Sequence, residues 1–106
     1  MKNSIWITGA SGQLGTEIVK LLKANTENRV VATDISDVDI TDSLQVERAA
    51  DLYRPTVIIN CASISNIAYC EDHMVEAFKV NALGARNLAN ISRKLNAKII
   101  QLSTDD

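Results

Sequence analysis

Three glycines near the N-terminus form the most specific chemical feature of the sequence. Residues 8–15 read TGASGQLG, which places Gly9, Gly12 and Gly15 at a G-x-x-G-x-x-G spacing between a β-branched run and a helical pattern. In a dinucleotide-binding turn the first glycine permits the tight turn, the second lets the backbone approach a pyrophosphate, and the third lets the helix pack closely. The helix N-terminus then offers free amides to the phosphates. The pattern favours such a turn over one that merely needs small residues.

An acidic residue follows at the position where this chemistry needs one. Asp34 comes directly after the β-branched run 29–33. A carboxylate there accepts hydrogen bonds from both hydroxyls of the adenosine ribose and repels a 2′-phosphate. The sequence therefore favours NAD(H) over NADP(H), with a solvated acid at a strand end as the alternative.

The elements that must position these residues alternate between two periodicities. Short β-branched runs predict strands, and longer segments with apolar residues at helical spacing predict helices. A continuous apolar strand is typical of burial on both faces of a parallel sheet. Gly84 lies inside the last helix and indicates close packing there. The predicted strands are 5–8, 29–33, 56–60 and 98–102, and the predicted helices are 13–24, 43–52 (capped by Asp42 or Thr41) and 72–95.

This alternation predicts an α/β fold, a three-layer Rossmann-type parallel sheet with right-handed crossovers. We expect one domain over residues 1–106, with strand order 3-2-1-4 and truncation after the fourth strand. Ligands bind such sheets at the carboxyl ends of the strands, where the order reverses. In the expected order that point lies between the first and fourth strands.

Composition excludes several function classes. The chain has 106 residues, 46% of them hydrophobic and 23% charged, which is typical of a globular protein. Its net charge of −2 does not favour nucleic-acid binding. Short apolar runs and the absence of a signal-like start predict a cytoplasmic protein without a membrane span. Two cysteines, Cys61 and Cys70, predict reduced thiols, and together with His73 they fit no closed zinc pattern.

Five segments extend the argument to a family. The strings TGASGQLG, ATDISDVDITD, RPTVIINCAS, VNALGARNLA and QLSTD span residues 8–105. Together they resemble the extended short-chain dehydrogenase/reductases, and most closely the dTDP-4-dehydrorhamnose reductases and related sugar-nucleotide reductases. The resemblance implies a nicotinamide cofactor, a nucleotide-linked 4-keto-sugar substrate and an oxidoreductase of nucleotide-sugar metabolism.

The resemblance also implies roles for individual residues. On the adenosine side it assigns Gly9, Gly12, Gln13, Leu14 and Gly15 to the pyrophosphate turn, Asp34 to the ribose, and Asp39 and Ile40 to the adenine. On the nicotinamide side it places Cys61, Ala62 and Ser63 beside the cofactor, Ser65 toward the substrate, and Asn81 near the site. Thr104 matches the Ser/Thr that hydrogen-bonds the substrate carbonyl oxygen.

The sequence departs from the family at the proton donor. Relatives carry a Y-x-x-x-K pair after the Ser/Thr, whereas Tyr53 and Tyr69 precede Thr104 and are followed four residues later by Val57 and His73. We therefore expect this polypeptide to bind the cofactor without completing the reduction. The fourth strand, with Ile99, Ile100 and Leu102, would present an apolar edge, which predicts self-association or limited stability.

Two other functions remain open from the sequence. One is a non-catalytic regulatory relative, since the same fold serves as the regulatory subunit of methionine adenosyltransferase. The other is a sugar-nucleotide epimerase or dehydratase. Fold alone does not decide among them.

Overall fold

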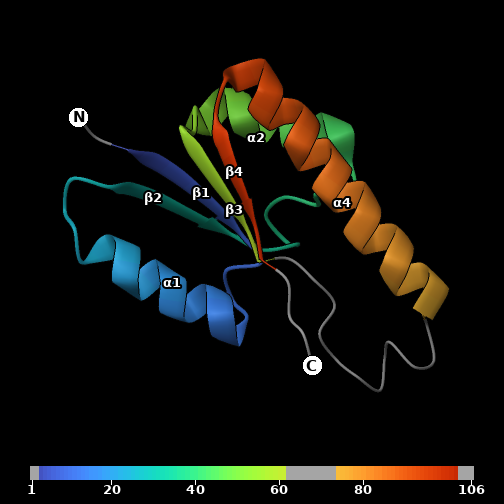
Figure 1. The fold of residues 1–106 in the computed structure, drawn as a ribbon, viewed down its shortest axis with the longest axis horizontal. Helices are drawn as coiled ribbons and strands as arrows, with labels where there is room; N and C mark the ends of the chain where they lie inside the picture. The colour runs from blue at the N-terminus through green and yellow to red at the C-terminus, as the bar shows by residue number, and fades with distance from the viewer. Residues whose placement is uncertain (1–2, 62–73, 103–106) are drawn as a thin grey trace.

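A computed structural model describes residues 3–61 and 74–102. Strands and helices alternate along this part of the chain, as predicted (Figure 1). They are β1 Ser4–Thr8, α1 Gln13–Lys23, β2 Arg29–Thr33, α2 Ser43–Tyr53, β3 Val57–Asn60, α4 Met74–Leu95 and β4 Lys98–Gln101.

The four strands form one parallel sheet between two helical layers. Helix α1 covers one face, and α2 and α4 cover the other (Figure 1). The α/β class and the three-layer Rossmann-type arrangement are therefore confirmed. No helix in the described part of the chain is both long enough and apolar enough to cross a membrane.

The predicted strand order 3-2-1-4 is wrong, because the observed order is β2-β1-β3-β4. The third strand pairs with β1, aligning Trp6 with Ile58 and Thr8 with Asn60. Right-handed crossovers explain the arrangement: α1 and α2 lie on opposite faces, so the two connections lead in opposite directions across the sheet. Burial agrees, since β1 and β3 are almost fully buried whereas Arg29 of β2 is exposed, as suits an edge strand. The order therefore reverses between β1 and β3, not between the first and fourth strands.

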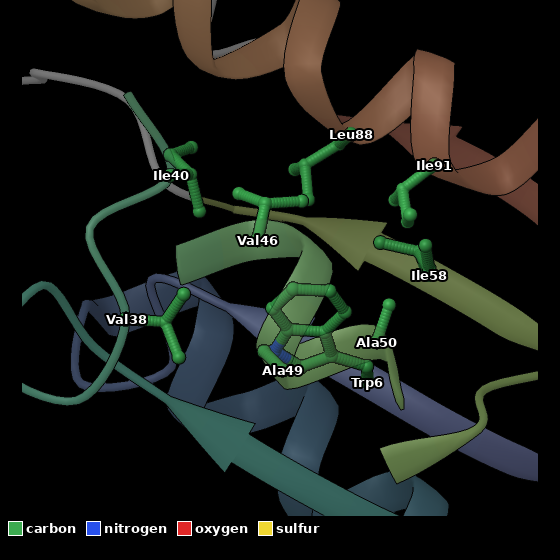
Figure 2. Close-up of a cluster of buried hydrophobic side chains, with 9 residues drawn as sticks. All are labelled: Trp6, Val38, Ile40, Val46, Ala49, Ala50, Ile58, Leu88 and Ile91. Atoms are coloured by element: carbon green, nitrogen blue, oxygen red, sulfur yellow. The ribbon is translucent and has the colours of Figure 1, made fainter. Parts of the chain in front are cut away.

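The larger core lies between the sheet and the helices α2 and α4. Trp6 is fully buried at its centre, where its indole Nε1 donates to Thr33 Oγ1 at 2.9 Å and its ring meets Tyr53 edge-on. Figure 2 shows the cluster, which consists of Trp6, Val38, Ile40, Val46, Ala49, Ala50, Ile58, Leu88 and Ile91. A smaller cluster under α1 is built on Ile5, Ile7 and Ile59. Each central strand thus contributes apolar side chains to both layers.

Local chemistry sets the ends of the helices. Asp42 caps α2 by accepting from the amides of Leu44 and Gln45 at 3.0 and 3.4 Å, which decides between the two predicted caps. Left-handed residues follow the helices α2 and α4, with φ of 49° at Arg54 and 55° at Asn96. The predicted start of the last helix at residue 72 lies outside the described residues.

Candidate functional site

The glycine turn leaves β1 at its carboxyl end and leads directly into α1. Gly9 adopts φ 68°, a conformation that side chains disfavour, and its carbonyl accepts from the Gly12 amide at 3.3 Å. A Cβ on Gly15 would lie 2.5 Å from the Gly9 carbonyl oxygen and 2.8 Å from Ala10 Cα. Gly15 therefore lets the helix pack against the turn itself.

Gly12 differs from its two neighbours in the motif. A Cβ there would meet only the Gly9 carbonyl oxygen, at 3.5 Å, so the space beside it is open. Gly12 is also the N-cap of α1, with no side chain to occupy the amides of the first turn and no acidic residue within that turn. These features suit a pyrophosphate, which needs close backbone approach and free amides.

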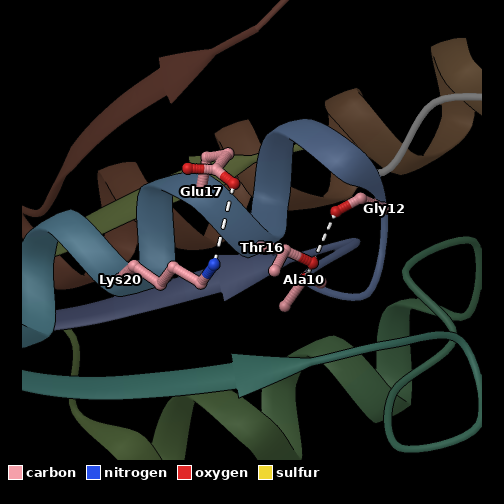
Figure 3. A network of polar contacts seen from close by, with 5 residues as sticks. All are labelled: Ala10, Gly12, Thr16, Glu17 and Lys20. Atoms are coloured by element: carbon pink, nitrogen blue, oxygen red, sulfur yellow. Dashed lines mark hydrogen bonds and ion pairs between the residues drawn. The ribbon is translucent and has the colours of Figure 1, made fainter.

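Thr16 braces the turn from the helix side. Its hydroxyl donates to the Gly12 carbonyl at 2.8 Å and lies 3.3 Å from the Ala10 carbonyl (Figure 3). The next turn of the helix carries an exposed ion pair between Glu17 and Lys20, 3.8 Å apart. The Thr16 hydroxyl thus ties the turn to the first turn of α1. Gln13 and Leu14, both exposed, begin the helix beside it.

Asp34 joins the glycine turn to the end of β2. Its Oδ2 accepts from the Ser11 amide at 3.2 Å, and the Ala10 amide donates to the Thr33 carbonyl at 3.0 Å. Asp37, which the sequence analysis did not single out, accepts from the Asp34 amide at 2.9 Å. The spacing DISD was the available signal, since aspartates often accept from nearby backbone amides. Two carboxylates therefore follow β2 beside the turn.

The loop after β2 carries the two residues assigned to the adenine. Asp39 Oδ1 accepts from the amide and the hydroxyl of Thr41 at 3.0 and 2.7 Å. The Asp39 amide donates to Gln45 Oε1 at 2.9 Å. Ile40 is only 7% exposed and points into the larger core. Its side chain is thus turned away from solvent, and its carbonyl accepts from Asn87 Nδ2 of α4 at 2.8 Å.

Cys61 follows β3 at the point where the strand order reverses. Its amide donates to the Thr8 carbonyl at 2.9 Å, and its side chain packs on the smaller core. Burial raises the pKa of the Cys61 thiol. The thiol is therefore protonated at neutral pH and is not an activated nucleophile.

A polar row along the strand ends was not predicted. Thr8 Oγ1 donates to Asn60 Oδ1 at 2.7 Å, and Asn60 Nδ2 donates to Gln101 Oε1 at 2.8 Å. The row crosses β1, β3 and β4 on the α4 face, and it fixes the register of the strand ends beside the site. The sequence signal for this row was that a polar residue, Thr8, Asn60 or Gln101, stands at the end of each of these apolar strands.

The structure thus brings the glycine turn, Asp34 and Cys61 together at the carboxyl ends of β1, β2 and β3. Asn81 is half-buried on α4 and has an interaction partner. The described residues contain no group of three or more His, Cys, Asp and Glu side chains able to hold a metal. Four predicted site residues lie outside the described residues: Ala62, Ser63, Ser65 and Thr104.

Comparison with known proteins adds to this geometry. A dTDP-4-keto-6-deoxy-D-glucose reductase of Streptomyces niveus is 42% identical over 99 residues, which cover 93% of this chain and 34% of that protein. A dTDP-4-dehydrorhamnose reductase of Bacillus anthracis, solved in complex with NADP, superposes with a TM-score of 0.86 at 36% identity, over 93% of this chain and 35% of that one. The UDP-glucose 4-epimerase of Thermus thermophilus, solved with NAD, gives a TM-score of 0.81 at 28% identity, over 92% and 35%.

The chain spans about a third of the length of the relatives it matches. Across its own length, residues 1–106 match the model of the family described as the RmlD substrate binding domain. The predicted resemblance to sugar-nucleotide reductases is confirmed. The chain belongs to the RmlD substrate binding domain family.

Proposed function

We propose that residues 1–106 are the dinucleotide-binding part of an NAD(P)-dependent reductase that acts on a nucleotide-linked 4-keto-sugar. One observation carries the proposal: Gly12 leaves open space at the N-terminus of α1 while Asp34 contacts the same turn through the Ser11 amide. A pyrophosphate and its adenosine ribose need these two features side by side. The nicotinamide complexes of two relatives support the same cofactor class.

Residues of the turn fit the cofactor in distinct ways. Gln13 and Leu14 would present main-chain amides to the pyrophosphate beside the open space at Gly12, while Asp34 would accept from the ribose hydroxyls. Cys61 would lie beside the cofactor as a neutral, space-filling side chain, because its thiol is protonated. When bound, the nicotinamide supplies a hydride to the substrate carbonyl. Thr104, assigned from the resemblance, would hydrogen-bond the carbonyl oxygen as negative charge develops there.

The substrate class rests on the relatives. The Streptomyces niveus and Bacillus anthracis proteins are both named as reductases of dTDP-linked keto-sugars, at 42% and 36% identity. The likeness to the epimerase is weaker, at 28% identity. These values favour the reductase over the epimerase, and they lend no support to a regulatory subunit.

The 106-residue chain has no Y-x-x-x-K pair. We therefore infer that it binds the cofactor without turnover, because the proton donor is missing. Incubation with NADH and a dTDP-4-keto-sugar should leave the NADH absorbance constant over hours. Steady oxidation that depends on both the sugar and the protein would overturn this inference.

Calorimetric titration with NADH tests the pyrophosphate site. Gly12→Val should weaken binding at least tenfold, because the side chain fills the space that the phosphates need. Ala24→Val, at the other end of α1, introduces the same side chain at an exposed position and should leave the affinity unchanged. Failure of the unsubstituted chain to bind NADH and NADPH would overturn the proposed function.

The cofactor preference is a separate proposal. Asp34 and Asp37 place two carboxylates after β2, and their charge should repel a 2′-phosphate. We expect NADH to bind about tenfold more tightly than NADPH. Asp34→Asn keeps the acceptor for the Ser11 amide and removes a charge, so the ratio should fall. Asp51→Asn, on the exposed side of α2, is the control. Equal affinities for both cofactors in the unsubstituted chain would overturn the preference.

Self-association remains a proposal as well. Ile100 of β4 is 40% exposed, and Lys98 and Gln101 of the same strand are exposed. An edge of this kind can pair with a second strand. Sedimentation should show dimers at high protein concentration, with fewer after Ile100→Lys, and a stable monomer would contradict the proposal.

A further inference from the structure

Helix α4 contacts the loop 38–42 at two positions that the proposed site does not use. Gly84 and Asn87 are one turn apart on the helix and therefore share a face. Both meet Ile40, which precedes them by more than forty residues in the sequence. One contact is steric, and the other is a hydrogen bond.

The steric contact explains why a glycine occurs inside α4. A Cβ on Gly84 would lie 2.6 Å from Ile40 Cδ1 and 2.8 Å from Ile40 Cγ1. Both distances are shorter than side chains tolerate, so the Ile40 side chain occupies the space that any other residue at 84 would fill. Glycine is unfavourable in a helix interior, and its presence here serves the fit with the loop.

The hydrogen bond fixes the main chain of the same residue. Asn87 is 9% exposed, and its Nδ2 donates to the Ile40 carbonyl at 2.8 Å. Such a buried carbonyl would lose its partner if the amide were removed, which is costly. Gly84 thus sets the position of the Ile40 side chain, while Asn87 sets the orientation of its carbonyl.

The hydrogen bonds within the loop set its shape, whereas the contacts with α4 set its position. The Asp39 carboxylate accepts from the amide and the hydroxyl of Thr41, and the Asp39 amide donates to the Gln45 side chain. These bonds define the shape of the loop. The contacts with α4 fix where that shape lies relative to the sheet. Ile40 is joined to α4 in the larger core, where Leu88 of the same helix also packs (Figure 2).

We propose that Gly84 and Asn87 are positioning residues for the adenine side of the dinucleotide site, acting through Ile40. The proposal rests on the proposed function, because the adenine role that the family resemblance implies for Asp39 and Ile40 requires a bound dinucleotide. It adds a long-range determinant of affinity for the adenosine half of the cofactor. The pyrophosphate turn, which is held by β2 and α1, should not depend on it.

The hydrogen bond is tested with Asn87→Leu, which removes the donor at nearly constant size. Binding of ADP and NADH should weaken about tenfold, while binding of reduced nicotinamide mononucleotide, which lacks adenine, should change less than twofold. Asn87→Gln, which keeps an amide, should recover part of the loss. Asn90→Leu makes the same change at an exposed position of α4 and should leave all three affinities unchanged.

The steric contact is tested with Gly84→Ala. The added methyl should displace Ile40 and weaken ADP binding several-fold. Ile40→Val in the same chain removes Cδ1, the atom closest to the new methyl, and should restore most of the affinity. Hydrogen exchange at the Thr41 amide, which donates to Asp39, should be faster in Gly84→Ala and slower again in the double variant.

These measurements separate the two proposals. If the unsubstituted chain binds NADH and all variants bind ADP within twofold of it, the positioning role is wrong and the proposed function stands. Equal losses for ADP and the mononucleotide would indicate general destabilisation and also overturn the positioning role. If the unsubstituted chain binds no dinucleotide, both proposals fall.

Discussion

The glycine turn at residues 9–16 and the loop at residues 34–42 sit at the same edge of the sheet but are held in different ways. The turn takes its conformation and its space from Gly9, Gly12 and Gly15, and main-chain bonds hold it together with the adjacent side chains of Thr16 and Asp34. The loop is held mainly by side chains, which come from the loop itself, from α2 and from α4. A short motif therefore encodes the turn, whereas residues far apart in sequence determine the loop.

This difference decides how each region responds to substitution. A Cβ on Gly15 would meet only backbone atoms of the turn, which cannot relax around an added atom. A loop held by flexible side chains can adjust, so single changes there should cost less stability. Substitutions that crowd the turn should therefore lower the free energy of unfolding more than substitutions in the loop.

Gly15→Ala should give the largest effect. Its Cβ would lie 2.5 Å from the Gly9 carbonyl oxygen, so the helix must move away from the turn. We expect a loss of about 3 kcal/mol in the free energy of unfolding, at the upper end for an overpacked site. Urea denaturation followed by circular dichroism measures it.

Gly12→Ala is the matched control for that change. The same methyl enters open space, 3.5 Å from its nearest neighbour, so stability should change by less than about 0.5 kcal/mol. Similar losses for the two variants would contradict the different roles assigned to the two glycines.

Asp42→Ala should have an intermediate effect on the loop side. It removes the acceptor for the amides of Leu44 and Gln45 at the start of α2, which should lower the free energy of unfolding by about 1 kcal/mol. Asp51→Ala, an exposed acid in the same helix, should be nearly neutral. If Asp42→Ala destabilised the chain as much as Gly15→Ala, the loop would be as rigid as the turn. That result would contradict the expectation that the loop can adjust to a substitution.

The same difference explains what the sequence could predict. The helices, the strands and the glycine turn follow from local patterns, and most predicted bounds agree with the structure within one or two residues. The strand order was wrong because it depends on which face α2 covers, and that is decided by packing between Trp6, Ile58 and the helices. Gly84 indicated close packing, but only the fold identifies Ile40 as its partner. Asn87 carried no local signal at all.

The smallest effect concerns the thiol of Cys61, which follows β3. Cys61 packs against the smaller core, and burial raises its pKa in the folded chain. Folding therefore favours the protonated thiol. Its contribution to stability is complete below the pKa of the unfolded thiol and is lost as the pH rises through the folded-state pKa.

Alkylation by iodoacetamide in a Cys70→Ser background measures this shift, because only the thiolate reacts. The reaction rate of the folded chain should rise at a higher pH than that of the same chain unfolded in urea. A reactive cysteine placed in the exposed loop, Ser36→Cys with Cys61→Ser, should follow the unfolded profile, because position 36 is open to solvent. Identical profiles for Cys61 in the folded and unfolded chains would mean that water reaches the thiol, which would contradict its burial against the smaller core.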